Sequence, residues 1–549
     1  MNLTYDVTMF RDNFESGFTW INGFNRNVFR FSERNALTDP LREKTWTYAD
    51  LNKEINRLAN RWQRDGVIKN DVVMYVLYNS AEFVFSHIAA QKAGAISCPV
   101  NYNWAAGEIA MVLEQNKPKV FLFDMEIEQI IKMALDLSFH KPEICISVGE
   151  KESEISGVIA YEKYVADSPE EEPVPPPSHI YDEVLRLHTS GTTGHPKGVP
   201  VNNINEVLTA HDVIMHFPLN PMDKTMNMTP WFHRGGIHSG GLTPTLYVGG
   251  EVVILRQFNP KICLKYTQKY RITFLIGVPA VLNMLAKYQE KENLDLQSLH
   301  GIVTMGSPLE KNACIYFQKV LTPNLFNGYG TTETFWNSFL SPRDLPEMSG
   351  SSGRSCTDDE IYLVKVYEDR KAEPDDFVAR NGEEVGEIII KSLSKSTCSY
   401  YDNEEETKRR YYKGFLYTGD LGTWDKNSYI TVVGRKDDMI ISAGENIFPA
   451  QIEEAISENS KVKDVIVTSV PDKKRGEAVV AYVVKEDDDL TVQEMIRYCA
   501  GHPMLSAFKS PKYYRFVEEL PYNATGKKLH FKAKQAAVQD LEEGRLERY

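Results

Sequence analysis

A loop rich in glycine, serine and threonine, closed by a lysine, is the first segment that could do chemistry. It lies in the stretch EVLRLHTSGTTGHPKG at 183–198, directly after an apolar, strand-like run. Small residues let backbone N–H groups approach a polyphosphate closely, and Lys197 adds a positive charge. The loop differs from a Walker A motif, because Gly198 follows the lysine where that motif carries Ser or Thr at the start of a helix. The segment predicts a phosphate site formed by Thr189, Ser190, Gly191, Thr192, Thr193, Gly194 and Lys197.

The longer string from Thr189 to Gly198 resembles the signature loop of the adenylate-forming superfamily. This superfamily comprises acyl-CoA synthetases, luciferases and peptide-synthetase adenylation domains. The remaining family motifs follow in the same order, beginning with TWTYADL at 45–51. The segment PWFH is similar to the family segment whose histidine, here His233, gates the acyl pocket beside the substrate carboxylate. The resemblance covers nearly the whole chain.

Two further motifs resemble the walls of the family's nucleotide site. TMGSP at 304–308 resembles the strand and turn that pack on adenine, and NGYGTTE at 327–333 resembles the loop that completes the site. By this resemblance Tyr329 stacks on adenine and Thr332 bonds the α-phosphate. Glu333 is the expected Mg²⁺ ligand, because Mg²⁺ prefers oxygen ligands and usually bridges one carboxylate to substrate phosphates. The other residues expected at the nucleotide are Gly306, Ser307, Pro308, Asn327, Gly328, Gly330 and Thr331.

The last motifs resemble the family's ribose, hinge, CoA and lysine segments. Asp420 can accept hydrogen bonds from both ribose hydroxyls, and Arg435 offers a fixed fork of donors to hydroxyl and phosphate oxygens. Asp437 stands where the family places the hinge between its two domains. Gly444 lies in a loop that resembles the contact with the CoA pantetheine. Lys527 matches the family's catalytic lysine, which neutralises charge that grows in the transition state.

The pattern of apolar runs predicts an α/β fold with two domains. Strand-like runs at 71–78 and 120–123 alternate with helical spacing such as 81–92, which is typical of mostly parallel sheets covered by helices. Near Gly434 shorter strand patterns begin, which indicates a small α+β domain. We therefore expect a large N-terminal AMP-binding domain at 1–434 and a small mobile C-terminal domain at 435–549, hinged near Asp437 and carrying Lys527.

Bulk properties exclude several classes of protein. A net charge of −14 argues against a nucleic-acid binder, which needs clustered cations. There is no apolar run of 18 residues and no basic segment followed by an apolar run at the start, so we expect a cytoplasmic location without a transmembrane segment. Seven scattered cysteines without a Cys-x-x-Cys pair suit reduced thiols, and we predict neither disulfides nor structural zinc.

Together the motifs predict an ATP-dependent carboxylate:CoA ligase. It would form an acyl-adenylate, release pyrophosphate, and pass the acyl group to the CoA thiol with release of AMP. The catalytic residues would be Lys527, Glu333, Thr332 and His233, and the cofactors ATP, Mg²⁺ and CoA. The alternative is an adenylation enzyme that loads an acyl group onto a carrier protein. A luciferase-like oxygenase and a non-catalytic binding protein are less consistent with the retained Lys197, Glu333, Asp420, Arg435 and Lys527.

The residues after Glu333 depart from the family pattern. Many members carry small residues there, whereas this chain has Phe335 and Trp336. Bulky rings would shorten or reshape the acyl pocket and favour a compact aryl, alicyclic or medium-chain acid. The alternative is that both rings pack in the core. The sequence leaves open the acid, the direction of the reaction and the oligomeric state.

Overall fold

The computed structural model describes residues 6–190, 196–306, 309–367, 369–442, 445–473, 475–502, 505, 509–522 and 528–548, without the side chains of 190, 445 and 446. The chain divides into two compact units. The first comprises Met1–Ile361 and Ile390–Leu416, and the second comprises Tyr362–Ile389 and Tyr417–Tyr549. The strands β17 (Glu360–Val364), β18 (Gly386–Lys391) and β20 (Phe415–Trp424) run from one unit into the other.

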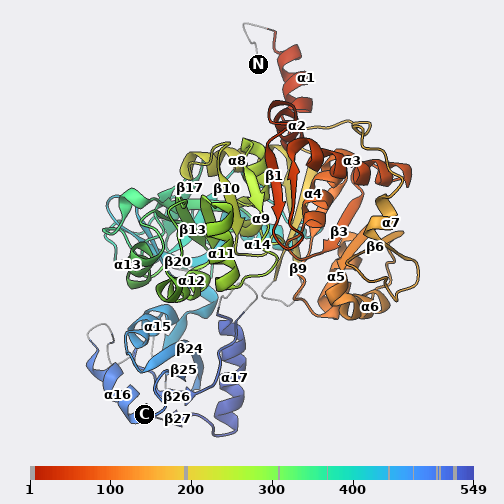
Figure 1. Cartoon of the computed structure of the whole chain (residues 1–549). Helices are drawn as coiled ribbons and strands as arrows, with labels where there is room; N and C mark the ends of the chain where they lie inside the picture. Colours follow the sequence, from red (N-terminus) through yellow and green to blue (C-terminus); the bar gives the residue numbers. More distant parts are fainter. Residues whose placement is uncertain are drawn as a thin grey trace. The chain divides into compact units, whose positions relative to one another are not determined.

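One framework of the first unit is a seven-stranded sheet, in the order β7-β6-β5-β3-β4-β8-β9 (Figure 1). All its pairs are parallel except the last, in which β8 and β9 form an antiparallel hairpin. The strands are β3 (Val72–Val76), β4 (Ile96–Pro99), β5 (Val120–Asp124), β6 (Ile144–Val148), β7 (Val158–Ala160), β8 (Glu183–Ser190) and β9 (Pro196–Asn202).

The other framework is a nine-stranded sheet, in the order β16-β15-β14-β13-β12-β10-β11-β1-β2. Its central pairs are parallel, and antiparallel strands close both edges. The strands are β1 (Asn35–Asp39), β2 (Lys44–Thr47), β10 (Lys224–Asn227), β11 (Glu251–Val253), β12 (Phe274–Gly277), β13 (Gly301–Met305), β14 (Leu325–Thr331), β15 (Phe335–Leu340) and β16 (Arg354–Ser355). The prediction of mostly parallel sheets is confirmed.

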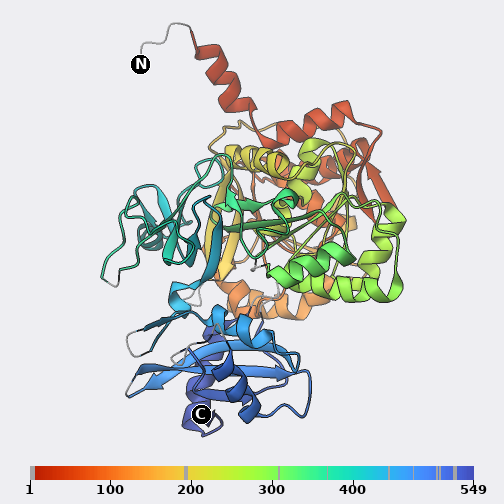
Figure 2. The same ribbon diagram turned by 90° about the vertical axis from the view of Figure 1, so that its left-hand side faces the viewer.

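Helices cover both faces of these sheets (Figure 2). The helices of the first unit are α1 (Thr8–Gly17), α2 (Trp20–Arg30), α3 (Tyr48–Arg64), α4 (Ala81–Ala93), α5 (Ala106–Asn116), α6 (Glu128–Leu137), α7 (Tyr161–Val165), α8 (Asn203–His216), α9 (Arg234–His238), α10 (Leu242–Val248), α11 (Pro260–Tyr270), α12 (Pro279–Glu292), α13 (Lys311–Val320) and α14 (Glu404–Arg410), of which α1 has no buried residue and does not cover a sheet.

The alternation of side chains along β3 explains why it is covered on two sides. Val73 and Tyr75 pack in one hydrophobic cluster with α3 and α4, whereas Met74 and Val76 pack in another with α5 and α6. A strand buried on both faces reads as a continuous apolar run, as this one does. The helix α4 is buried all round for the same reason, and it ends at Gly94, whose φ of 75° suits a residue without a side chain.

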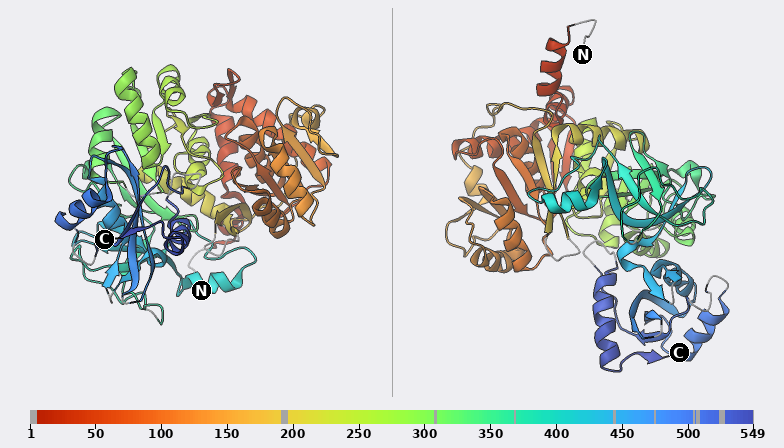
Figure 3. Two further views of the ribbon diagram at one scale, coloured as in Figure 1. Left: turned by 90° about the horizontal axis from the view of Figure 1, so that it is seen from below. Right: turned by 180° about the vertical axis from the view of Figure 1, so that it is seen from behind.

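The second unit is built on a sheet in the order β23-β22-β25-β26-β27, with β24 paired to β25 (Figure 3). In β24, Val465 and Val467 face α15 and α16, whereas Ile466 and Val470 face α17. The unit also holds the β20–β21 pair. Its elements are β21 (Ile430–Arg435), β22 (Ile440–Ser442), β23 (Glu445–Ile447), α15 (Pro449–Ser457), β24 (Val462–Asp472), β25 (Gly476–Lys485), α16 (Val492–Gly501), β26 (Tyr513–Phe516), α17 (His530–Glu542) and β27 (Glu547–Arg548).

The strands and helices of the second unit match the predicted sequence patterns. This unit has the α+β character expected for the small C-terminal domain, and the predicted runs at 464–470 and 478–484 form the paired β24 and β25. Among the described helices, none is long and apolar enough to cross a membrane.

Candidate active site

The predicted phosphate loop connects the two strands of a hairpin. Thr189 and Ser190 end β8, and their register partners Lys197 and Pro196 begin β9. Gly191, Thr192, Thr193 and Gly194 lie outside the described residues. The hairpin therefore brings the two ends of the loop side by side, with Lys197 next to the residues that open it.

Lys197 is buried against an acidic residue on α14. Its Nζ lies 2.6 Å from Oε1 of Glu406, and each side chain is 9% exposed. Burial opposes the charge of Glu406, but hydrogen bonds from Arg409 and Lys197 lower its pKa to about 2. Lys197 also lies 5.9 Å from the centre of the Tyr400 ring. The lysine is held in place by a partner 209 residues away, which no local sequence pattern indicates.

Glu333 is oriented by the same tyrosine. The hydroxyl of Tyr400 donates to Oε1 of Glu333 at 2.5 Å. Burial and the neighbouring carboxylate raise the pKa of Tyr400, so its hydroxyl keeps the proton that it donates. Tyr400 therefore links the predicted phosphate lysine to the predicted Mg²⁺ ligand. A half-buried carboxylate held at one oxygen fits the single hard ligand that Mg²⁺ takes from a protein beside substrate phosphates.

Arg234, the first residue of α9, fixes the backbone around Thr332. Its Nη1 donates to the carbonyl of Thr332 at 2.6 Å, and its Nη2 donates to the carbonyl of Lys395 at 2.5 Å. Burial lowers the pKa of this guanidinium to about 10, so it stays charged at neutral pH. Because His233 directly precedes α9, the same contacts bring the His233 and Glu333 segments together.

His233 is partly buried, and its Nε2 is inaccessible to solvent. Desolvation lowers its pKa to about 4, and its Nε2 has no hydrogen-bond partner among the described residues. Its ring lies 4.2 Å from that of Phe232, centre to centre. A buried polar atom without a partner is uncommon in a folded protein. The arrangement suits a histidine that meets a substrate group.

The predicted adenine segments end neighbouring parallel strands. Thr304 on β13 is in register with Asn327 on β14, so both lie near the carboxyl ends of their strands, where α/β sheets place ligands. Thr304 Oγ1 and Asn327 Oδ1 are buried without hydrogen-bond partners among the described residues. Gly306 follows β13 with a φ of 78°. The residues Gly328, Tyr329, Gly330 and Thr331 continue β14, whereas Ser307 and Pro308 lie outside the described residues.

The two rings that follow Glu333 are buried. Phe335 and Trp336 are 3% and 2% exposed, and they stack with centres 4.8 Å apart in a cluster that includes Phe339. Phe335 has a φ of 61°, in the left-handed region. Its ring lies 5.7 Å from that of His238 and 5.8 Å from the guanidinium of Arg234. The rings thus belong to the core and at the same time pack against α9.

The second unit holds the predicted ribose residues as a register pair. Asp420 on β20 faces Arg435 on β21, and Arg435 Nη1 lies 3.2 Å from Asp420 Oδ1. Asp437 follows in a short 3₁₀ helix at Lys436–Asp438. Gly444 and Lys527 lie outside the described residues. Sequence reasoning therefore found two residues that do lie together in this unit.

Glu453 on α15 and His530 on α17, which sequence reasoning missed, pair with each other in the second unit. His530 Nε2 lies 2.7 Å from Oε1 of the buried Glu453, which also accepts from the backbone N–H of Val467. Lys528, which follows the undescribed segment directly, donates to the carbonyl of Val465 at 2.6 Å. These bonds anchor the chain immediately after Lys527 to the sheet of the second unit.

Comparison with known proteins defines the class. The model of the AMP-binding enzyme family matches residues 24–400, and the model of the AMP-binding enzyme C-terminal domain matches residues 451–527. The chain belongs to the AMP-binding enzyme family. This result confirms the predicted adenylate-forming enzyme of the acyl-CoA synthetase branch.

The relatives include ligases for aliphatic and aromatic acids. The chain is 29% identical to a long-chain-fatty-acid–CoA ligase, FadD13, of Mycobacterium tuberculosis, over 90% of this chain and 93% of that protein. It is also 29% identical to an indoleacetate–CoA ligase of Aromatoleum aromaticum, over 88% of this chain and 92% of that protein. This class of enzyme uses a carboxylic acid, ATP and CoA.

Solved structures share the fold. The anthranilate CoA ligase AuaEII, solved with anthranoyl-AMP, superimposes with a TM-score of 0.85 at 22% identity, covering 97% of this chain and 99% of that one. The O-succinylbenzoate CoA synthetase MenE of Bacillus subtilis, solved with ATP and magnesium ion, gives a TM-score of 0.80 at 26% identity, covering 93% and 98%. The predicted fold class is confirmed.

Proposed function

We propose that the protein is an ATP-dependent carboxylate:CoA ligase for a compact aryl, alicyclic or medium-chain acid, and that it acts in the cytoplasm. The observation that carries the ligase proposal is the chain of contacts from Lys197 through Tyr400 to Glu333. It places a cation and a carboxylate around one tyrosine, and a polyphosphate with its metal ion requires both kinds of group.

In the first half-reaction the acid's carboxylate oxygen attacks the α-phosphorus of ATP, and pyrophosphate leaves. Mg²⁺ bound at Glu333 supplies positive charge at the phosphates. Thr189, Ser190 and the glycine loop position the triphosphate, and Lys527 offsets charge at the α-phosphate. Most of the rate enhancement in such a transfer comes from positioning and preorganised charge.

The carboxylate end of the acid would meet His233. Its buried Nε2 without a partner supports a contact with the substrate, and its low pKa keeps the ring neutral beside an anion. The nucleoside would contact the ends of β13 and β14 with its base and Asp420 and Arg435 with its ribose.

In the second half-reaction the CoA thiol attacks the acyl carbonyl, and AMP leaves. We propose that the domain at 435–549 moves about Asp437 between the two steps. It would withdraw Lys527 and bring the Gly444 loop to the pantetheine. The pair of Asp420 with Arg435 next to the proposed hinge supports this assignment.

The size of the acid is inferred from Phe335. Its ring packs against His238 and Arg234 of α9, the helix that directly follows His233. Phe335 itself stands two residues after Glu333 in the chain. A ring in this place would limit the depth of a pocket that opens at His233. The indoleacetate and anthranilate ligases among the similar proteins are consistent with a compact aromatic acid.

The test is an assay of the purified protein with Mg-ATP, CoA and a panel of acids, following AMP and pyrophosphate. We expect CoA-dependent AMP formation with at least one compact acid. Lys527→Ala should lose adenylation yet still transfer the acyl group from a supplied adenylate to CoA. Formation of AMP only with a carrier protein would instead support the carrier-loading alternative and reject the CoA assignment.

A further inference from the structure

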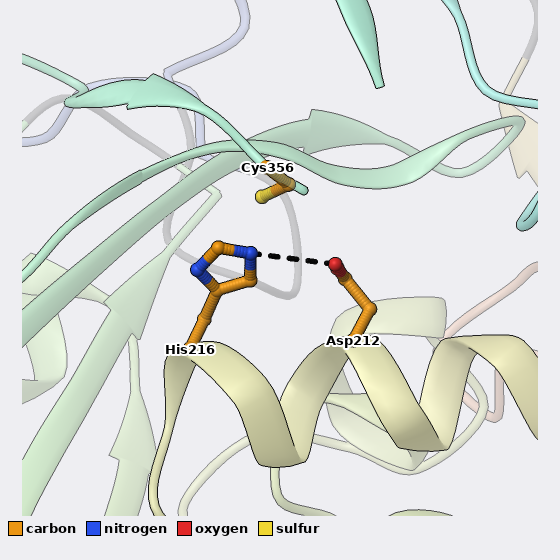
Figure 4. Close-up of side chains that lie close together, drawn as sticks. All are labelled: Asp212, His216 and Cys356. Atoms are coloured by element: carbon orange, nitrogen blue, oxygen red, sulfur yellow. Dashed lines mark ion pairs between the residues drawn. The ribbon is translucent and has the colours of Figure 1, made fainter. Parts of the chain in front are cut away.

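Three side chains that the proposed reaction does not use converge beneath β15. Asp212 and His216 lie one turn apart on α8, and Cys356 follows β16 (Figure 4). One potential ligand atom from each lies within 4.8 Å of the other two. Figure 4 shows the three side chains pointing toward one another. A thiol, an imidazole and a carboxylate are the ligand types that zinc prefers.

One carboxylate oxygen in this cluster has no hydrogen bond. Asp212 is 2% exposed, and its Oδ1 lacks a hydrogen-bond partner among the described residues while lying 3.4 Å from His216 Nε2. Leaving a buried carboxylate oxygen unbonded is costly unless another group satisfies it. The oxygen therefore points to a ligand at the centre of the cluster.

The neighbouring lysine cannot supply that bond. Lys395 Nζ already donates to Asp212 Oδ2 at 2.8 Å, to Asp359 Oδ2 at 2.6 Å and to the carbonyl of Trp336 at 2.6 Å. An ammonium group has three N–H donors, and these three acceptors use all of them. Asp212 Oδ1 is left on the side of His216 and Cys356.

The charge balance also favours a cation. Lys395 is a single buried cation between two buried carboxylates, those of Asp212 and Asp359. With neutral His216 and Cys356 the cluster carries one net negative charge. A divalent ion that displaces the thiol proton adds one net positive charge, since Zn²⁺ brings two and the thiolate removes one. The buried cluster would then be electrically neutral, which is the cheaper state in a low dielectric.

His216 provides both a nitrogen ligand atom and a route by which solvent can reach the cluster. Its Nε2 accepts a hydrogen bond from the backbone N–H of Thr357 at 3.2 Å, and a metal ion bound at this nitrogen would replace that bond. Its side chain is 21% exposed, and Thr357 is exposed. Solvent can therefore reach the centre, and a water or the Thr357 hydroxyl is available as a fourth ligand.

We infer that Asp212, His216 and Cys356 form a binding site for a zinc-type divalent transition-metal ion. Binding forms a metal–sulfur bond at Cys356 Sγ and releases the thiol proton to solvent. Bonds of roughly 2.0–2.3 Å place tetrahedral ligands about 3.3–3.8 Å apart, so the three atoms need to move together by about 1 Å. This proposal departs from the sequence expectation of no structural zinc, which rested on Cys-x-x-Cys spacing and could not detect ligands brought together by folding.

The proposed metal site would stabilise the segment that carries Glu333. Lys395 ties Asp212 to the carbonyl of Trp336 on β15, and the carbonyl of Lys395 accepts from Arg234, which also holds Thr332. The metal is therefore expected to act through structure, without touching the substrates.

The test is to dialyse the full-length protein against chelator, add Zn²⁺ or Co²⁺, and measure metal content and the cobalt spectrum. We expect one metal ion per chain, a sulfur-to-cobalt charge-transfer absorption, and release of a proton on binding. Cys356→Ser and His216→Gln should each weaken metal affinity by more than the roughly 10- to 100-fold that outer-sphere partners contribute.

Cys314→Ser is the matched control, because Cys314 is also buried and free but lies on α13. It should keep the metal and the absorption band. If the wild type binds less than a tenth of an equivalent, or if the Cys314 variant loses the band and the Cys356 variant keeps it, the proposal is wrong. His216→Gln tests the proposal where Cys356→Ser fails to fold, since this partly exposed position tolerates a polar amide.

Discussion

Tyr400 donates a hydrogen bond of 2.5 Å to Glu333, and its ring centre lies 5.9 Å from Nζ of Lys197. One buried phenol thus aligns the two groups that a metal–polyphosphate complex needs. Because the chain next to α14 holds the ring in place, the two groups are aligned before any ligand binds. Preorganised charge of this kind costs no rearrangement when the substrate reacts.

We predict that Tyr400→Phe lowers the rate of adenylation by roughly 10- to 100-fold, since a hydrogen bond to a charged group contributes about 1.5–3 kcal/mol. The loss should be greatest at low Mg²⁺, because a carboxylate that is no longer held binds the ion less well. Pyrophosphate release across a Mg²⁺ titration measures both effects. Tyr411→Phe is the control, since the Tyr411 hydroxyl bonds to that of Ser396 and acts on Glu333 through charge, without a hydrogen bond to it among the described residues. An unchanged Mg²⁺ dependence in Tyr400→Phe would contradict the role given to Tyr400.

We predict that the ion pair of Lys197 with Glu406 stabilises the fold at neutral pH and that this stabilisation is lost in acid. The pKa of Glu406 is lowered to about 2, so its contribution is present above the ordinary carboxyl pKa of about 4.5 and is lost as pH falls toward 2. Glu406→Gln should therefore lower the free energy of unfolding by roughly 1–3 kcal/mol at pH 7 and by less at pH 3.

Urea unfolding at several pH values measures this difference. Glu404→Gln is the matched control, because Glu404 pairs with Lys408 on the exposed face of the same helix. It should change stability little at any pH, as exposed pairs usually do. Equal effects of the two variants on the free energy of unfolding would show that the burial of Glu406 adds nothing to the stability of the protein.

Contiguous motifs could be predicted from the sequence, but their partners could not. The strand and the loop that lead to Lys197 could be predicted from local composition, as could the apolar runs that form β3 and β5, whereas the second strand of the hairpin, β9, was not predicted. Glu406 and Tyr400 come from a segment about 200 residues further on, and neither belongs to a run with a recognisable spacing. The role of Arg234 could not be predicted either, because the two carbonyl groups to which it donates lie far apart in the sequence. Only folding brings them together.

A pH effect of opposite sign is predicted in the second unit. Burial opposes the charge of His530, but its hydrogen bond and attraction to Glu453 outweigh burial and raise the pKa of His530. The stability that the pair of His530 with Glu453 contributes is fully present below the ordinary histidine pKa of about 6.5. It is lost as pH rises through the raised pKa of His530. We expect amide exchange in α17 to become faster as pH rises through that window, after correction for intrinsic exchange.

His530→Gln should remove this pH dependence and give fast amide exchange in α17 over the whole pH range. His502→Gln is the control, because His502, which follows α16, pairs with Glu458 and not with a residue of α17. If the pH dependence of α17 survives in His530→Gln, the anchor after Lys527 lies elsewhere.

The last prediction concerns the length of the acid. Phe335 has a φ of 61°, which glycine adopts without strain, so Phe335→Gly removes a ring without opposing the backbone. The space left beside His238 and Arg234 should let acids several carbons longer bind, and kcat/KM should shift from compact to longer acids by at least about 10-fold, the effect of one or two methylenes in an apolar pocket. Phe335→Leu keeps most of the bulk and should retain the wild-type preference. A Phe335→Gly enzyme that folds, as judged by its thermal unfolding, but keeps the original ranking of acids would show that the ring only fills the core.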